Sequence, residues 1–281
     1  MPDFPRTQVI PQVGASARFE VEGRPVATYE FGPAEPKPCL FPLLGPSGRP
    51  VTRMGHPGDP ITHAHHRSVW IAHQSVNGVN FWEESKGALI VHDHMASYED
   101  GDRAALTAVN RWMDAEGREQ MRETRRIAVT PRPERELWVD TECAFEPAES
   151  GTVLGQTSFG FLAVRVAKTM SVQFGRGRIL SSEGGVNEAQ VHWRRARWVD
   201  YAGEVAPDTM EGICFLDHPA NPRHPTYWHV RDDGWMGAGF CHDQPWDLGA
   251  TPLRLQYRLY VHRGEGDAAR FDGEWQRCAG S

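Results

Sequence analysis

The sequence contains few lysines, and its positive charges form no basic block. Of its 30 Lys and Arg residues only Lys37, Lys86 and Lys168 are lysines, and the formal net charge is −7 at pH 7. Domains that bind nucleic acids usually carry clustered positive charge, so we expect no nucleic-acid partner. The many arginines provide planar groups that can hold carboxylates or sugar hydroxyls, although a bias in genomic base composition is the simpler explanation.

Cysteine is also scarce. The five cysteines are odd in number, widely separated and never spaced as C-x-x-C: Cys39, Cys143, Cys214, Cys241 and Cys278. This pattern argues against a disulfide framework and against a thiolate zinc site. We therefore expect reduced cysteines in the core.

Long apolar runs and the common catalytic motifs are absent from the sequence. No window approaches the ~20 apolar residues that a membrane helix needs, and the N-terminus lacks a charged segment followed by an apolar run. We expect a soluble, cytoplasmic protein with no membrane partner. The absence of a nucleophile elbow, phosphate loop, H-E-x-x-H motif and dinucleotide fingerprint removes the commonest hydrolase, ATPase and dehydrogenase classes.

Strand patterns, in contrast, occur along the whole chain. Residues 17–31 alternate apolar and polar on either side of a turn at Gly23 and Pro25, which predicts a hairpin. Residues 137–145 and 253–261 alternate in the same way, with one apolar face each. Many short strands in one chain indicate an all-β fold, and we predict a large two-sheet antiparallel sandwich with few short helices.

We predict that residues 1–281 form a single β-sandwich domain. Residues 1–16 are interpreted as a possible extended N-terminal arm, and residues 267–278 as a possible short helix that packs Phe271 and Trp275. The segment 161–172 fits a strand or a short helix equally well.

The stretch 61–84 is rich in residues that can bind a metal or transfer a proton, since it holds four of the thirteen histidines. If residues 62–66 are extended, His63 and His65 share one face, an arrangement that can bind a metal. No carboxylate follows at the spacing of a cupin-like site, so a proton-transfer role for His66 and His73 is preferred. Downstream, Asn77 begins a predicted tight turn. The neighbouring Trp82 lies beside carboxylates, as a sugar site requires.

A second concentration lies at residues 217–234, where three prolines stiffen a polar segment. Rigid loops with many titratable groups are often functional sites. This segment supplies Asp217, His218, Arg223, Trp228, His229 and Arg231. Between the two motifs, Glu183 precedes a Gly-Gly turn and is a weaker acid–base candidate.

The stretches HAHHRSVWIAHQSVNGVNFWEE and DHPANPRHPTYWHVRDDG resemble those of a bacterial family labelled PmoA-like, or methane oxygenase PmoA. The resemblance extends from about residue 35 to residue 262. It implies a role in sugar catabolism and a fold similar to the galactose mutarotase-like supersandwich of aldose epimerases. Relatives frequently have glycine at the position of Ser68 and an aromatic residue at the position of Asp233.

We therefore expect a carbohydrate-active enzyme that performs acid–base chemistry on a sugar or keto-sugar, as an epimerase or mutarotase or as a lyase or hydrolase. The catalytic candidates are His66, His73, His218 and His229, with Asp217 and Glu183 as orienting or second acids. The candidates for binding the substrate are Asn77, Trp82, Arg223, Trp228 and Arg231.

Two alternatives stay open. One is a metal-dependent oxygenase or isomerase that uses His63, His65 and another histidine as ligands, and the other is a noncatalytic sugar-binding accessory protein. We expect no cofactor, with a divalent metal as the alternative. A small sugar or sugar derivative is the expected partner, and an oligomer is compatible with the sequence.

Overall fold

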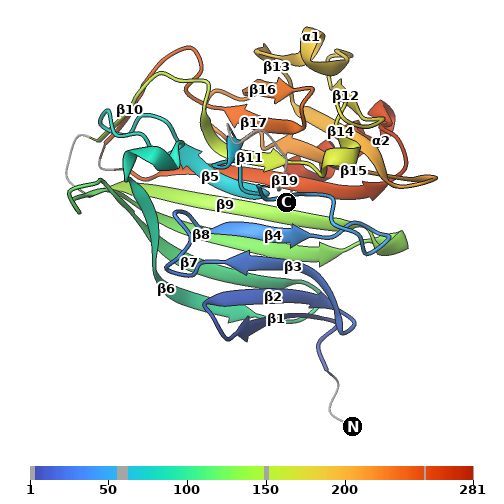
Figure 1. Cartoon of the computed structure of the whole chain (residues 1–281), viewed down its shortest axis with the longest axis horizontal. Helices are drawn as coiled ribbons and strands as arrows, with labels where there is room; N and C mark the ends of the chain where they lie inside the picture. Colours follow the sequence, from blue (N-terminus) through green and yellow to red (C-terminus); the bar gives the residue numbers. More distant parts are fainter. Residues whose placement is uncertain (1–3, 56–62, 149–151, 250, 281) are drawn as a thin grey trace.

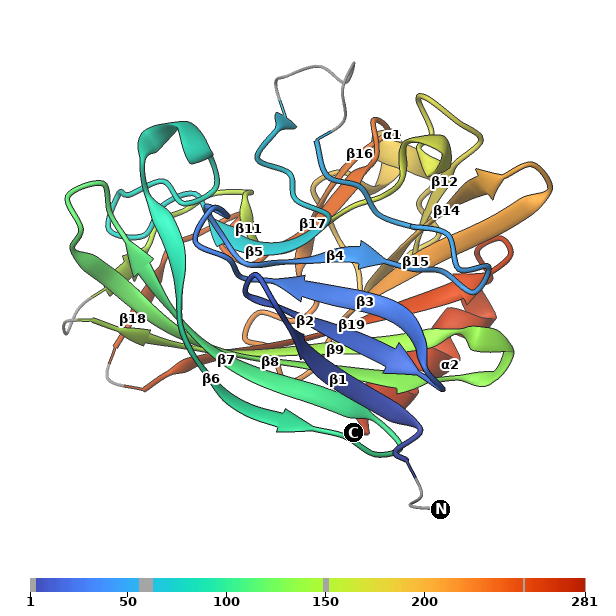
Figure 2. The same ribbon diagram turned by 60° about the horizontal axis from the view of Figure 1, so that its bottom comes forward.

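The computed structural model describes residues 4–55, 63–148, 152–249 and 251–280. Two large antiparallel sheets face each other (Figure 1, Figure 2). The predicted all-β, two-sheet antiparallel sandwich is therefore confirmed. No helix in these residues is both long and apolar enough to cross a membrane.

The first sheet has nine strands and carries both sequence motifs. In spatial order its strands are β1 (Thr7–Gln12), β2 (Ser16–Val21), β3 (Arg24–Glu30), β4 (Cys39–Leu43), β5 (Val69–His73), β11 (Gly160–Arg165), β17 (Trp235–Gly239), β16 (Tyr227–Arg231) and β13 (Arg194–Arg195). The motif strands β5 and β16 are separated only by β11 and β17. Segments about 150 residues apart in sequence are therefore close in space.

The second sheet has eight strands. In spatial order they are β12 (Arg178–Ser181), β14 (Trp198–Ala206), β15 (Thr209–Asp217), β19 (Leu253–Arg263), β9 (Leu137–Pro147), β8 (Glu119–Pro131), β7 (Ala104–Met113) and β6 (Leu89–Glu99). Strands β10 (Thr152–Leu154) and β18 (Trp246–Leu248) form a separate pair. The helices are α1 (Asn187–Val191) and α2 (Ala268–Ala279), with 3-10 turns η2 (Glu84–Lys86), η3 (Pro133–Arg135) and η4 (Lys168–Met170).

The N-terminal prediction needs a correction. Residues 7–12 do not form an extended arm, because β1 pairs with β2 from Thr7 and Val21 to Gln12 and Ser16. The predicted hairpin follows as β2 and β3, and its turn residue Gly23 has a φ of 73°. The ambiguous segment 161–172 begins as strand β11 and continues into the short turn η4.

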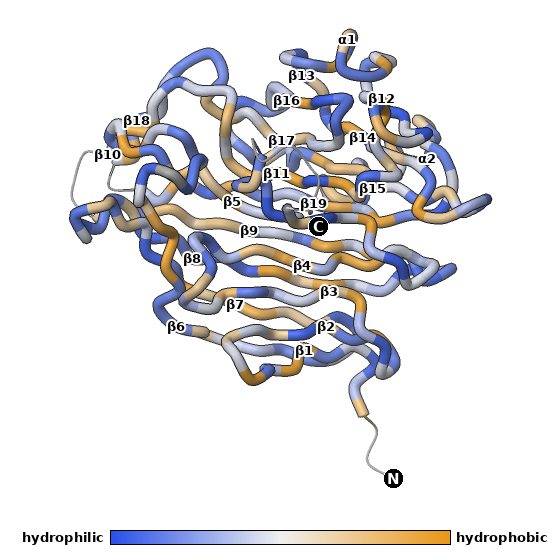
Figure 3. The backbone as a smooth tube through the Cα atoms, viewed as in Figure 1, coloured by the Kyte–Doolittle hydropathy of each residue, from blue (hydrophilic) through white to orange (hydrophobic). Residues whose placement is uncertain are grey.

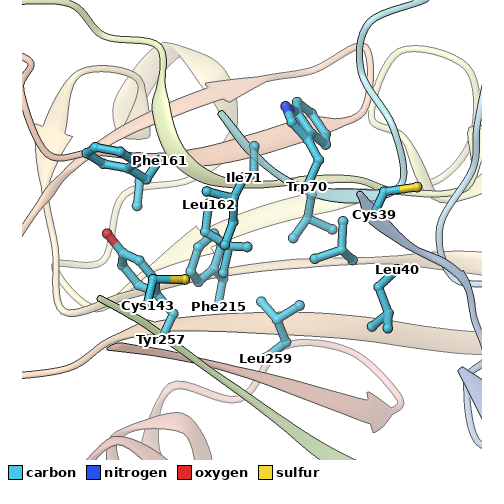
Figure 4. Packing of buried hydrophobic residues seen from close by; sticks show 14 of the residues in the cluster. Cys39, Leu40, Trp70, Ile71, Cys143, Phe161, Leu162, Phe215, Tyr257 and Leu259 are labelled. Carbon is cyan, nitrogen blue, oxygen red and sulfur yellow. The ribbon is translucent and has the colours of Figure 1, made fainter. Parts of the chain in front are cut away.

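The core lies between the two sheets. In β9 the predicted inward set is buried, namely Leu137, Val139, Thr141, Cys143 and Phe145, and Figure 3 shows hydropathy alternating along the strands. Figure 4 shows Ile71 and Leu162 of the nine-stranded sheet on one side of the core, and Phe215 and Leu259 of the eight-stranded sheet on the other. The five cysteines are free and buried, as predicted.

Helix α2 covers the outer face of the eight-stranded sheet. The Asp267 side chain accepts hydrogen bonds from the amides of Ala269 and Arg270 and so begins the helix. Phe271 and Cys278 are buried in a second apolar cluster with Trp198 and Tyr260. The predicted helix over 267–278 is confirmed, and because of it β19 is buried on both faces over much of its length.

Candidate active site

A cavity of about 430 Å³ joins the two sequence motifs, a volume in the range of small-molecule sites. Its lining residues come from six segments of the chain: His63, His65, His66, Gln74, Trp82, Glu83, Phe159, His192, Trp193, His229, Arg231, Asp233 and Trp235. The sequence predicts that His66 or His73 shares a cleft with His218 or His229, and His66 and His229 both line this cavity.

Aromatic rings form the floor of the cavity. Trp235 lies at its centre, with ring centroids 5.8 Å from Trp82 and 6.4 Å from Phe159. Trp70 supports the floor from β5, 5.4 Å from Trp82, and its indole points away from the core residue Leu259 (Figure 4). An apolar floor of this kind can stack against the face of a sugar ring.

His66 and His229 contact the central tryptophan from two directions. The Trp235 ring centroid is 4.6 Å from that of His66 and 4.3 Å from that of His229. Both imidazoles are nearly buried, with 2% and 5% of each residue exposed. The Nδ1 atom of His229 is buried and has no hydrogen-bond partner among the described residues.

Burial keeps these imidazoles neutral. It lowers the pKa of His229 to about 3 and that of His65 to about 4, and it holds the pKa of His66 well below the usual value. Neighbouring histidines and arginines add to the effect, because each disfavours a further positive charge. At pH 7 the cavity wall therefore presents uncharged imidazoles, each with one donor and one acceptor nitrogen.

A tight turn, not an extended strand, presents the first three histidines. The His66 amide donates to the His63 carbonyl, 3.1 Å away, and the rings of His63 and His66 stack with centroids 4.9 Å apart. The extended geometry considered for His63 and His65 is thus wrong over residues 63–66, and residue 62 lies outside the described residues. No group of three or more His, Cys, Asp or Glu within the described ranges is placed to hold a metal ion.

Two buried polar residues fix this turn. Arg165 of β11 donates to the carbonyl oxygens of His63 and His66, at 3.2 and 3.5 Å. Ser68 has a φ of 52° and its hydroxyl donates to the Leu40 carbonyl at 2.6 Å. A positive φ favours glycine, so a serine at this position is held in a strained conformation. In this chain the Ser68 hydrogen bond offsets part of the strain.

Trp82 and Glu83 are also held by specific hydrogen bonds. The Asn80 side chain accepts from the amides of Trp82 and Glu83, at 2.9 and 3.0 Å. The buried Lys37 ammonium donates to the Trp82 carbonyl at 2.7 Å. The Glu83 side chain is half-buried at the cavity wall and makes no ion pair with a described residue, so its carboxylate is available to a ligand.

The opposite wall combines α1 with the turn between β16 and β17. Glu188 and Asp232 exchange two hydrogen bonds of 2.9 Å between amides and carboxylates, which fixes the helix against the turn. The next residue, Asp233, has its Oδ2 atom 3.9 Å from His63 Nδ1. Arg231 reaches the cavity wall and its Nε lies 3.1 Å from Glu188.

The structure places His73 and Trp228 away from the cavity, although both lie on motif strands. Alternate residues of a strand point to opposite faces, so His73 shares the face of Ile71 and not that of Trp70. Its ring stacks on Phe161, 4.8 Å away, and its Nε2 lies 3.1 Å from the Gly155 carbonyl. Trp228 likewise faces the core, 4.8 Å from Phe215.

Asp217, at the start of the second motif, holds the following loop together by hydrogen bonds. Asp217 accepts hydrogen bonds from Asn221, His224 and the Thr226 amide, at 2.7 to 2.8 Å. It thus orients His224, outside the cavity.

Other predicted residues of this segment and its surroundings also lie elsewhere. His218 accepts from the Ala220 amide, and Arg223 donates to the carbonyls of Phe240, Gln244 and Pro245. Glu183 is exposed and accepts from Ser182. Asn77 forms the predicted tight turn with Gly78, at φ values of 51° and 80°, and accepts from the Val153 amide. The structure therefore does not bring these residues to His66 and His229.

Sequence reasoning missed several residues of the cavity. Glu83 and Asp233 lie beside predicted site residues but are not among the residues that the sequence predicts for the site. Trp235 follows Asp233 at the end of a hairpin turn. Phe159, His192 and Trp193 come from segments with no motif. Only the pairing of β11 with β5 and of β13 with β16 brings them to the site.

A second cavity of about 440 Å³ lies beside η3 and is lined by Arg132, Glu136, Tyr260 and Arg270, among others. Glu136 is already ion-paired with Arg270 and bonded to the Tyr260 hydroxyl. Because the polar atoms of these residues already bond to one another, this cavity has fewer groups available to bind a ligand than the histidine-lined cavity.

Fold and cavity together define an all-β sandwich protein with a histidine-lined, aromatic-floored site. The profile of DUF6807, a family of unknown function, matches residues 16–276, and the chain belongs to this family. No curated protein matches the sequence.

Proposed function

We propose that this protein is a carbohydrate-active enzyme that performs acid–base chemistry on a sugar or keto-sugar bound in the histidine-lined cavity. The observation that carries the proposal is the combination of an aromatic floor with neutral imidazoles and two carboxylates in one cavity. The floor suits the apolar face of a sugar ring, and the polar wall suits its hydroxyls.

The proposed roles of the two histidines follow from their lack of charge. His66 and His229 are neutral, so each can donate a hydrogen bond to a carbonyl or ring oxygen on which negative charge develops. With a pKa near 3, His229 is a weak base, and an available carboxylate is better suited to accept a proton. Glu83 is our candidate for that transfer, and Asp233 beside His63 is the second.

We further propose that the sandwich belongs to the galactose mutarotase-like supersandwich class and to the PmoA-like group that the sequence resembles. Two antiparallel sheets of nine and eight strands support the first point. A cytoplasmic location is proposed from the five free cysteines.

Turnover of a panel of sugars and keto-sugars, followed by NMR, tests the function. The panel covers ring opening, epimerisation, elimination and glycoside cleavage. For a substrate found this way, we expect E83Q, H66Q and H229Q each to lower kcat/KM by about 10²-fold or more.

The matched control is H94Q, since His94 is exposed on β6 and bonded to Asp93. It should retain wild-type kcat/KM. Sugar binding without turnover of any compound would contradict the enzyme proposal and favour a noncatalytic sugar-binding protein. Full activity in both E83Q and H229Q would contradict the assigned roles.

A further inference from the structure

Trp193 is an unusual residue at the mouth of the cavity. It is the one exposed tryptophan in the described parts of the chain, with 51% of the residue accessible. It adopts a φ of 57°, a conformation that costs free energy for a bulky residue. A 2.7 Å hydrogen bond from its amide to the Trp228 carbonyl and stacking on His192, 4.4 Å away, hold it there.

An aromatic strip continues from Trp193 away from the cavity. The His242 ring lies 5.8 Å from Trp193, and the Tyr227 ring lies 4.4 Å beyond it. On the cavity side, Trp193 is 6.2 Å from His229. The strip is therefore continuous with the cavity wall.

Polar groups lie along this strip. Ser158 bonds to His242 Nδ1 at 2.7 Å, which leaves Nε2 of that ring for another partner. Arg195 lies over the Tyr227 ring at 4.4 Å and pairs with Asp243 at 3.2 Å. Stacking surfaces flanked by an imidazole, a carboxylate and a guanidinium match the alternating apolar faces and hydroxyl edges of a saccharide.

We propose that Trp193 and His242 form a second subsite that holds the next sugar ring, so that the substrate is a glycosidically linked saccharide and not a free monosaccharide. This inference rests on the proposed function, because it takes the cavity as the site of the first ring. A solvent-facing indole held in a costly backbone conformation is explained by a ligand that stacks on it.

Calorimetric titration of the full-length protein tests the subsite with matched saccharides: D-glucose against cellobiose and maltose, and D-galactose against lactose. In the wild type we expect at least one disaccharide to bind about tenfold more tightly than its constituent monosaccharide, the effect of one added stacking contact. In W193A this ratio should fall to about one, and W193F should recover part of it.

The control variant is F174A, which removes another exposed aromatic residue and should keep the wild-type ratio. An unchanged ratio in W193A, or equal affinities for both sugars in the wild type, would overturn the subsite. If H229Q abolishes binding while W193A leaves the ratio unchanged, the subsite fails and the proposed function stands. If the wild type binds none of these saccharides, the subsite fails, whereas the proposed function is decided separately by turnover of the sugar and keto-sugar panel.

Discussion

Buried imidazoles give this protein a cavity wall that stays uncharged at neutral pH. Each buried histidine was moved out of water into aromatic surroundings, which disfavours its charged form. The same physics acts on His66 and His229 in the cavity and on His73 in the core. What separates them is position: His66 lies in the turn before β5 and His229 on the cavity face of β16, whereas His73 lies on the core face of β5.

His73 provides a test at the scale of one residue. Its folded pKa is lowered to about 4 by burial, below the value of about 6.5 in an unfolded chain. Between these values the unfolded state binds one more proton, so stability is full above about pH 6.5 and is lost as the pH falls toward 4. The His73 contribution to this loss is about 1.4 kcal/mol per pH unit.

The variant H73Q should therefore show a smaller decrease in the free energy of unfolding between pH 6.5 and 4 than the wild type. Urea unfolding at several pH values measures this decrease. The free energy of unfolding at pH 8 gives the general destabilisation caused by the substitution, which is then separated from the pH-dependent part. The same slope in both proteins would mean that His73 is not buried in the neutral form.

At the scale of the element, the cavity depends on turns more than on strands. The histidine turn at 63–66 is set by Arg165 on β11 and by Ser68. Trp82 and Glu83 are set by Asn80 and Lys37. Of these supports, Arg165 and Lys37 come from distant parts of the sequence, which explains why a local motif indicated the histidines but not their geometry.

Helix α2 offers a test of an element that the sequence predicted well. Asp267 accepts hydrogen bonds from Ala269 and Arg270, at 2.9 and 3.2 Å. Because an N-cap satisfies amides that have no partner in the helix, D267A should lower the free energy of unfolding by about 1 kcal/mol. D267N keeps an acceptor and should lose less. Both are measured by urea unfolding, and equal stability of D267A and wild type would show that packing alone holds the helix.

At the scale of the whole molecule, the all-β sandwich could be predicted because the alternation of apolar and polar residues is visible within the sequence of each strand. In β9 the inward set from Leu137 to Phe145 follows directly from period two. The arm prediction failed because pairing of Thr7 with Val21 depends on a partner strand and not on composition.

The site could be predicted only in part for the same reason. Both motifs contribute to the cavity, since β5 and β16 lie in one sheet. Which histidines reach it depends on sheet order and on the face of each strand, so His73 and His218 lie elsewhere. Trp193 and Trp235 carried no local signal and required the fold.

The central claim is that a sugar binds on the aromatic floor between His66 and His229. A crystal structure of the protein soaked with the tightest-binding saccharide tests it most directly. We predict a sugar ring stacked on Trp235 or Trp82, with oxygens within hydrogen-bond distance of His66, His229 and Glu83. A saccharide bound at another place, with this cavity holding only water, would contradict the account.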